Sequence, residues 1–459
     1  MQSLSDSFQF FDKVATLELK KNPKYAKFLD WCTEQGINLE RIDYPLAFGP
    51  SGFLVGVGTS KQVQKGEWTL RTPCSSRIDY ETIRNSSGVG VIIKSLDVNQ
   101  DFTLALYYMH QFLLGAESHL YHPIQVSAPA DLPFQWTDDE IDFIQDIPAI
   151  TQIRQMRAQA LQDADEIYIK VLENGCLDYF CPGEQTKENF INQYLEAWVI
   201  TQNRIISFGF NLKYYSIIPM IEQVNHTPGR SSIWQVVDSE GSVLTENSIG
   251  NLNCYCIPGI EAINGKSFLP PSEEVFETII SEVPIDVIQD TTSYFVPPEG
   301  SFFQLVSSHD LEVGESIPCS YGDMTNRYHF VNYGFYLSNN ESNCFSIKLK
   351  ISGKEQTILL HQNNKHDKFL SLCKQVLIDA GLKTCTYSLV CQFAIDLIKQ
   401  QYAIDFGKSF DDAEQQIEEF DSKRKRLAYE YKTEQKKMYS YHITDLQKLI
   451  VSKNNTLFN

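Results

Sequence analysis

The alternation of two kinds of sequence along the chain is the feature that most constrains its fold. Short apolar runs separated by Gly, Pro, Asn and Ser occupy residues 53–70 and 214–336, which is typical of short β-strands joined by turns. Helical periodicity dominates residues 101–210 and returns after residue 345. The alternation predicts an α+β chain, in which a helical insert interrupts one β-rich domain and an all-α domain follows it.

These changes of pattern also predict the domain boundaries. We expect the β-rich domain over residues 20–340, with its helical insert at about 101–210. Between the β-type runs lies a long stretch, at about 230–298, that includes the acidic sequence SEEVFETIISEVPIDVIQD. Its length predicts an extra acidic insertion that caps a cleft or contacts a partner. The helical domain is expected over 345–459.

Two short segments have patterns that predict a single helix or strand. Residues 24–37 have apolar side chains at helical spacing before Gly36, which predicts a short amphipathic helix that ends at this glycine. Residues 90–94, with the sequence GVIIK, predict a further strand because they are rich in β-branched side chains.

Charge and cysteine content restrict the functional classes. With 58 acidic and 39 basic residues the formal charge is −19, so nucleic acid and anionic membranes are not expected as partners. The eleven cysteines lack paired CxxC spacing, which predicts free thiols in a reducing compartment and no metal site. The N-terminal residues lack a signal-peptide pattern, and the chain has no apolar run of membrane-spanning length. We therefore expect the cytoplasm as the location, with the nucleus as the alternative.

Two segments carry the strongest functional signal: IIPMIEQVNH at 217–226 and SYGDMTNRYHFVNYGF at 320–335. Together they resemble the signatures of SET-domain protein methyltransferases. Their order is similar to the branch that contains the RuBisCO large-subunit lysine methyltransferase and the actin-histidine methyltransferase, with P-x-x-D-x-x-N-H followed by Y-G-x-x-x-N and Y-G-F. The helical insert and the C-terminal run RLAYEYKTEQKKM also resemble that branch. The likeness extends from about residue 25 to the end.

The resemblance implies a pseudoknotted SET domain that uses S-adenosylmethionine to methylate a lysine or histidine of a protein. Methyl transfer is an in-line displacement on a neutral nucleophile, so most of its catalysis comes from positioning and electrostatics. The resemblance places Tyr321 at the transfer site, where its phenol oxygen would orient the incoming nitrogen. It places Tyr333 and Phe335 in the acceptor channel, although either aromatic side chain could instead belong to the core.

The residues that the resemblance assigns to cofactor binding are Gly52, Phe53, Gly56, Arg204, Glu222, Asn225 and His226. The glycines would let the backbone approach the cofactor closely. Their register is open. Gly56 can be the second glycine of a Gly-x-Gly motif that has Leu54 at its first position, the motif can be the GVG of residues 56–58, or a longer loop can use Gly52 and Phe53.

The charged members of this set also have alternatives. Arg204 would pair with the cofactor's carboxylate, or it forms an ion pair with a nearby acidic side chain. Glu222 stands where the family has aspartate. These departures motivate a second hypothesis, in which the chain is a catalytically inactive SET-fold subunit of a larger assembly. In either case we expect a protein substrate or partner to bind the C-terminal helical domain and the insertion at 230–298.

Overall fold

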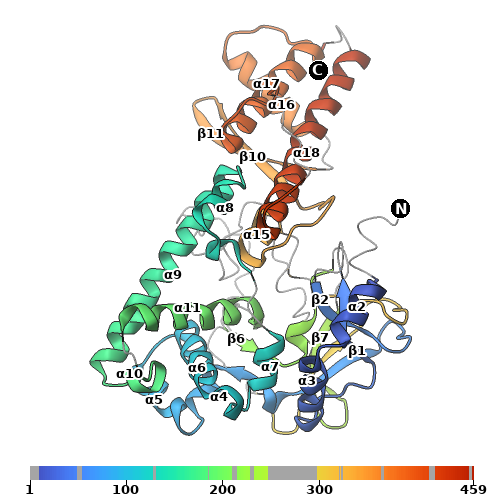
Figure 1. Ribbon diagram of the computed structural model, residues 1–459. Coiled ribbons are helices and arrows are strands. Elements are labelled where there is room, and N and C mark those ends of the chain that lie inside the picture. The colour runs from blue at the N-terminus through green and yellow to red at the C-terminus, as the bar shows by residue number, and fades with distance from the viewer. Residues whose placement is uncertain are drawn as a thin grey trace. The chain divides into compact units, whose positions relative to one another are not determined.

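The structure is a computed structural model of the 459-residue chain (Figure 1). Contacts group the chain into a first unit, residues 1–130 with 158–323, and a second unit, residues 131–157 with 324–459. The residues that the structure describes are 10–48, 54–127, 131–183, 186–208, 214–227, 232–246, 297–319, 321, 324–362, 366–412, 419–453 and 457–458.

Three small antiparallel sheets form the β-structure of the first unit. A hairpin pairs β1 with β2, a four-stranded sheet has the order β3-β9-β7-β8, and a three-stranded sheet has the order β4-β6-β5. The strands are β1 (Ile42–Phe48), β2 (Leu54–Thr59), β3 (Trp68–Pro73), β4 (Ile78–Asp79), β5 (Ile206–Phe208), β6 (Tyr214–Ile217), β7 (Ile233–Val237), β8 (Val243–Glu246) and β9 (Phe302–Val306). Since β3 and β7 both pair with β9, the four-stranded sheet joins segments from both sides of the helical insert.

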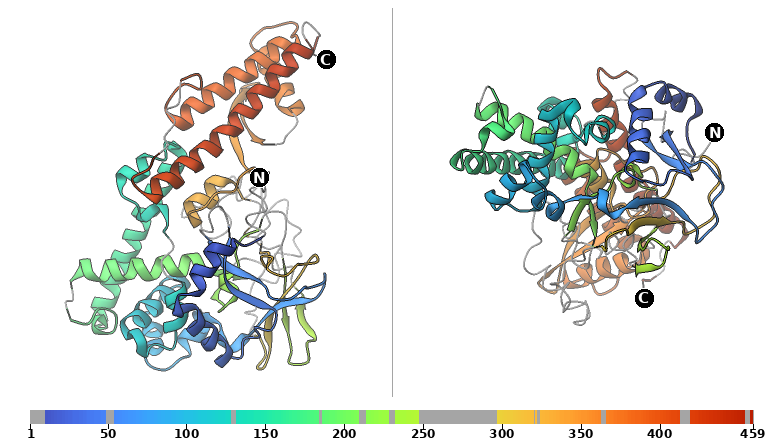
Figure 2. Two further views of the ribbon diagram at one scale, coloured as in Figure 1. Left: turned by 45° about the vertical axis from the view of Figure 1, so that its right-hand side comes forward. Right: turned by 90° about the horizontal axis from the view of Figure 1, so that it is seen from below.

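Helices cover these sheets and form the insert. They are α2 (Lys13–Lys20), α3 (Pro23–Glu34), α4 (Tyr80–Arg84), α5 (Val89–Leu96), α6 (Gln100–Leu114), α7 (Tyr121–Val126), α10 (Leu177–Phe180) and α11 (Lys187–Arg204), with the C-terminal part of α9 (Ile147–Glu173). The helix α3 was expected: the Asn22 side chain caps its N-terminus, and Gly36 follows it with φ +75°. The helix α2 lies against β1 (Figure 2). The Ala47 N–H donates to Thr16 Oγ1 at 3.0 Å.

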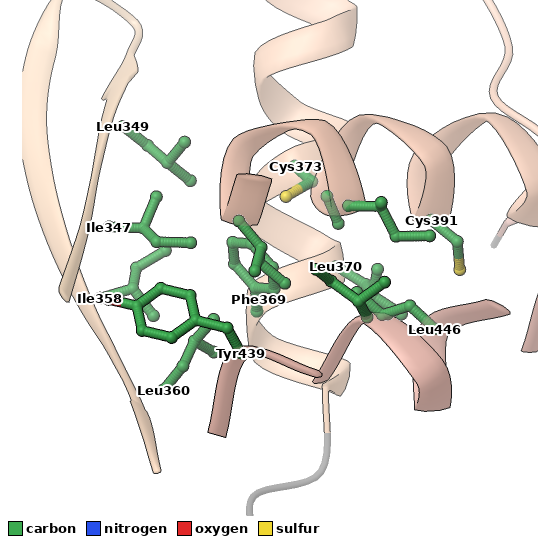
Figure 3. Close-up of a cluster of buried hydrophobic side chains, with 14 of the residues drawn as sticks. Ile347, Leu349, Ile358, Leu360, Phe369, Leu370, Cys373, Cys391, Tyr439 and Leu446 are labelled. Atoms are coloured by element: carbon green, nitrogen blue, oxygen red, sulfur yellow. The ribbon is translucent and has the colours of Figure 1, made fainter. Parts of the chain in front are cut away.

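The C-terminal part, expected to be all-α over residues 345–459, is not: the second unit contains a β-hairpin as well as helices. Its elements are α8 (Asp138–Asp142), the first turns of α9, α15 (Asn326–Tyr333), β10 (Cys344–Ile351), β11 (Lys354–His361), α16 (Asp367–Asp379), α17 (Tyr387–Phe406) and α18 (Lys423–Ser452). Side chains of the hairpin, among them Ile347 and Leu360, face Phe369 and Leu370 of α16 in one apolar core (Figure 3). Tyr439 of α18 stacks on Phe345 with 4.1 Å between the ring centroids.

A buried polar network fixes the segment 131–157 to the rest of the second unit. The Asp146 carboxylate is fully buried; one oxygen lies 3.2 Å from Arg327 Nη2, and the other accepts a 2.7 Å hydrogen bond from the Tyr431 hydroxyl. Gln435 Nε2 donates in turn to the Tyr431 oxygen at 3.0 Å. Since a buried charge is stable only when it is paired and hydrogen-bonded, this network explains why residues 131–157 group with the C-terminal helices.

The α+β class is confirmed, and some local predictions need correction. Residues 90–94, predicted as a strand, lie in α5, where Val89, Ile93 and Leu96 are buried on one helical face. A five-residue window of β-branched side chains is too short to show this period. Within the stretch predicted as an insertion, residues 233–237 and 243–246 form β7 and β8 of the four-stranded sheet, and residues 247–296 lie outside the described part of the chain.

Candidate functional site

Two distant segments of the first unit approach closely at Gly56 and Asn225. Asn225 Nδ2 donates a 3.0 Å hydrogen bond to the Val55 carbonyl oxygen of β2. A Cβ at position 56 would lie 2.3 Å from Asn225 Nδ2 and 3.2 Å from Phe48 Cδ2, so only glycine fits here without displacing its neighbours. Gly58 faces a different environment, with Leu46 Cδ1 and the Glu315 carbonyl as its nearest neighbours. Of the two described candidate glycines, Gly56 is therefore the one that contacts Asn225.

Tyr321 lies against the same segment and is held there by two hydrogen bonds. Its backbone N–H donates to His226 Nδ1 at 3.0 Å, and its hydroxyl donates to the Val224 carbonyl oxygen at 3.1 Å. The Tyr321 and His226 rings are 5.4 Å apart. His226 and Cys319 also form a β-bridge, in which the Thr227 N–H donates to the Cys319 carbonyl oxygen at 2.9 Å. The backbone thus fixes where the phenol ring of Tyr321 lies.

The His226 imidazole is neutral in this setting. It is 7% exposed, and burial lowers its pKa to about 4. A neutral ring can accept a hydrogen bond through Nδ1, as the contact with the Tyr321 N–H requires. At physiological pH the ring therefore adds no positive charge next to Tyr321.

A buried polar cluster lies around Glu222 on the same segment. Burial raises the pKa of Glu222, while nearby Arg204 and hydrogen bonds from Gln223 and Ser127 act in the opposite direction. The Ser127 hydroxyl lies 3.4 Å from Glu222 Oε1, and Gln223 connects this group to the Tyr44 hydroxyl, which donates to Gln223 Oε1 at 3.1 Å. Ser127 and Tyr44 could not be expected here from the sequence, since nothing near them indicates contact with a residue about 100–180 positions away.

Arg204 ends α11 close to this cluster. Its Nη1 donates to the Glu222 backbone carbonyl at 3.0 Å, so the contact is with the main chain of the segment. The Arg204 Nε–H is buried and has no hydrogen-bond partner among the described residues. A buried guanidinium donor without a partner costs free energy, which a bound carboxylate would recover.

The two aromatic residues expected in an acceptor channel belong to the second unit. Tyr333 is the last residue of α15, and Gly334 follows it with φ +70°. Phe335 is 7% exposed and stacks on His329 with 4.9 Å between the ring centroids, and its ring centroid lies 6.0 Å from that of Tyr333. They form an aromatic cluster with His329 in that unit.

The remaining sequence features do not add to this site. Gly52 and Phe53 lie outside the described residues. The described side chains contain no cluster of three or more His, Cys, Asp or Glu suited to a metal ion. Within the described ranges no helix has the length and apolar character needed to cross a membrane. The basic run at the start of α18 pairs with acids, as in the contacts of Arg424 with Asp131 and of Arg426 with Glu430.

Comparison with solved structures identifies the fold. The SET domain of LSMT bound to lysine and AdoHcy superposes with a TM-score of 0.58 at 13% identity, covering 95% of this chain and 93% of that chain. The chain has the SET-domain fold. Rubisco LSMT bound to sinefungin and monomethyllysine gives 0.57 at 13% identity over 95% of both chains, and Rubisco LSMT bound to AdoMet gives 0.55 at 12% identity over 95% and 94%. No family model and no curated protein sequence matches the chain. The SET fold predicted from the two motifs is thereby confirmed.

Proposed function

We propose that this SET-fold protein is an S-adenosylmethionine-dependent protein N-methyltransferase whose acceptor is a lysine, with histidine as the alternative. The observation that carries the proposal is the convergence of three distant segments in one unit: the β2 backbone at Gly56, the Asn225–His226 pair and Tyr321. The proposal is also supported by the ligands of the solved neighbours, which are AdoMet, AdoHcy and lysine or monomethyllysine.

The cofactor fits two features of the first unit. The Arg204 Nε–H is a buried donor without a partner among the described residues, and a guanidinium is well shaped to bind the carboxylate of the cofactor's amino-acid end. The strand β2 presents bare backbone at Gly56, next to Asn225. When bound, S-adenosylmethionine supplies an electrophilic methyl group on a sulfonium. A neutral His226 suits that cation, because a charged imidazole would repel it.

Tyr321 is the residue we assign to the transfer step. A phenol oxygen can accept a hydrogen bond from an incoming amine while its own hydrogen is donated, here to the Val224 carbonyl. Orienting that amine for in-line attack is the contribution we assign to the phenol. The placement of Tyr333 and Phe335 in the acceptor channel remains a prediction.

One contact favours the alternative function of a SET-fold subunit without catalysis. The Asn225 amide nitrogen donates to the chain's own Val55 carbonyl, so part of its hydrogen-bonding capacity is used within the protein. In that case the fold would serve as a binding platform in a larger assembly. We place either function in the cytoplasm or nucleus, as expected from the scattered spacing of the cysteines in the sequence.

The experiment that separates the two functions follows the methyl group. The chain is incubated with tritiated S-adenosylmethionine and an extract of its source cells, and labelled proteins are digested to identify methyl-lysine or methyl-histidine. We expect labelling that Tyr321→Phe reduces about 100-fold or more, as when a transition-state hydrogen bond is lost. Tyr179→Phe, at an exposed tyrosine of α10, is the matched control and should label as the wild type does. Equal labelling by both variants would remove Tyr321 from the transfer step.

A further inference from the structure

Two arginines converge on one tryptophan at the four-stranded sheet of the first unit. The guanidinium carbons of Arg41 and Arg71 lie 4.5 and 4.8 Å from the centroid of the Trp68 ring. Arg41 Nη1 also donates to the Trp68 carbonyl oxygen at 2.8 Å, so its position is fixed. All three side chains are half-buried and none is fully covered. An indole face with two guanidiniums around it combines apolar area with strong anion-binding groups.

The positive charge of this group is only partly balanced. Arg41 forms an ion pair with Glu67 at 3.4 Å. Arg71 forms no ion pair with a carboxylate of the described residues; Arg71 Nε donates to the neutral Gln304 Oε1 at 2.6 Å. Burial and the neighbouring Arg41 both lower the pKa of Arg71. The pair of arginines is therefore short of one negative charge.

A polar ladder extends from Arg71 across the sheet. Arg71 of β3, Gln304 of β9 and Gln235 of β7 are direct cross-strand neighbours. Gln304 Nε2 donates in turn to Gln235 Oε1 at 2.8 Å. The amide nitrogen of Gln235, at the end of this chain of hydrogen bonds, can donate to a ligand. The Arg71 guanidinium reaches the turn between β7 and β8, where a Cβ on Gly241 would lie 3.6 Å from its Nη2.

We propose a docking surface for an acidic peptide segment of a partner protein, the arginine–tryptophan patch, which consists of Arg41, Trp68, Arg71 and Gln235, with buried Gln304 linking the last two. A carboxylate of the partner would form an ion pair with Arg71. A second acidic or aromatic side chain would contact Trp68, and the Gln235 amide nitrogen would donate to a peptide carbonyl. The occupant we assign is a peptide because the patch offers one guanidinium without a carboxylate partner among the described residues, beside an indole ring and an amide donor, which suits one carboxylate and one peptide carbonyl, whereas a nucleic acid needs a row of cations. This surface is independent of methyl transfer.

The test is fluorescence anisotropy of fluorescein-labelled hexaglutamate with the full chain, using hexaglutamine as the uncharged probe. We expect hexaglutamate to bind and hexaglutamine not to, and we expect the affinity to fall as salt rises. Arg71→Gln should weaken binding about 10- to 100-fold, as expected for a lost charge-assisted hydrogen bond. Arg71→Lys should give an intermediate loss, because lysine keeps the charge without the planar fork.

The matched control is Arg84→Gln, which removes another arginine stacked on an aromatic ring, that of Tyr80, in the same unit. This variant should bind hexaglutamate as the wild type does. Circular dichroism checks the fold of each variant, and Arg41→Gln replaces Arg71→Gln if the latter does not fold. Absence of binding at low salt, equal affinity of the Arg71 and Arg84 variants, or tighter binding of a thymidine oligonucleotide than of hexaglutamate would each overturn the proposal.

Discussion

Replacing Gly56 with alanine should destabilise the first unit, because the added Cβ would clash with the Asn225 side chain. The new Cβ would lie 2.3 Å from Asn225 Nδ2 and 3.3 Å from Asn225 Cγ, so the Asn225 side chain has to move. When it moves, it loses its 3.0 Å hydrogen bond to the Val55 carbonyl. The substitution therefore combines overpacking with a lost hydrogen bond.

The size of the effect follows from these two contributions. The hydrogen bond is worth about 1 kcal/mol. Overpacking of a close contact costs about 1–3 kcal/mol. Together they predict that Gly56→Ala lowers the free energy of unfolding by about 2–4 kcal/mol. In an Asn225→Ala background the nearest remaining neighbour is Phe48 Cδ2 at 3.2 Å, which a small shift accommodates, so the same substitution should cost less than about 1.5 kcal/mol there.

Urea unfolding of the wild type, both single variants and the double variant measures this coupling in a double-mutant cycle. Asn85→Ala, at an exposed asparagine with a 3.5 Å side-chain contact, is the control for removing an asparagine and should change stability by less than about 0.5 kcal/mol. If Gly56→Ala costs the same free energy with and without the Asn225 side chain, the close approach of these two residues is not the reason for glycine at this position.

Two further predictions concern charge. His226 is neutral in the fold with a pKa of about 4, so its contribution to stability is complete above pH 6.5 and is lost as pH falls from there towards 4, by about 3 kcal/mol in total. Urea unfolding at pH 7.5 and 4.0 should show this loss in the wild type and a smaller one in His226→Gln; equal pH dependence would contradict it. Asp146→Ala removes the nearer carboxylate of half-buried Arg327 and the acceptor of the Tyr431 hydroxyl, with Asp405 remaining at 3.9 Å, and should lower the stability of the second unit by about 3 kcal/mol. Asp142→Ala, which removes an exposed pair, should cost less than about 1 kcal/mol, and comparable losses in both variants would refute the role of the network.

The sequence allowed the architecture to be predicted because period and turn residues are local signals. The helix α3 falls in the segment predicted to be helical before Gly36, β9 lies in the strand-type run 214–336, and the long helix α18 lies in the helical stretch after residue 345. The prediction failed where the signal was short, as in α5. The strand β11 was missed because its first residues, KEQT, are exposed and polar, and only pairing with β10 makes them a strand.

The candidate site was less predictable because its contacts join residues far apart in the sequence. The order of the motifs points to Asn225, His226 and Tyr321, but the register of the glycine motif depends on a contact between distant segments, such as that of Gly56 with Asn225. The environment of Glu222 depends on Ser127, and no local pattern indicates that contact. The arginine–tryptophan patch depends on strand register for the same reason.

Isothermal titration of the folded chain with S-adenosylmethionine, and with S-adenosylhomocysteine, tests the central claim most directly. The proposed site predicts micromolar binding that Asn225→Ala and Arg204→Ala weaken about 10-fold or more, while Arg154→Ala, at an exposed arginine, leaves it unchanged. No detectable heat from folded protein at high ligand concentration would contradict the claim and favour the non-catalytic function of this SET fold.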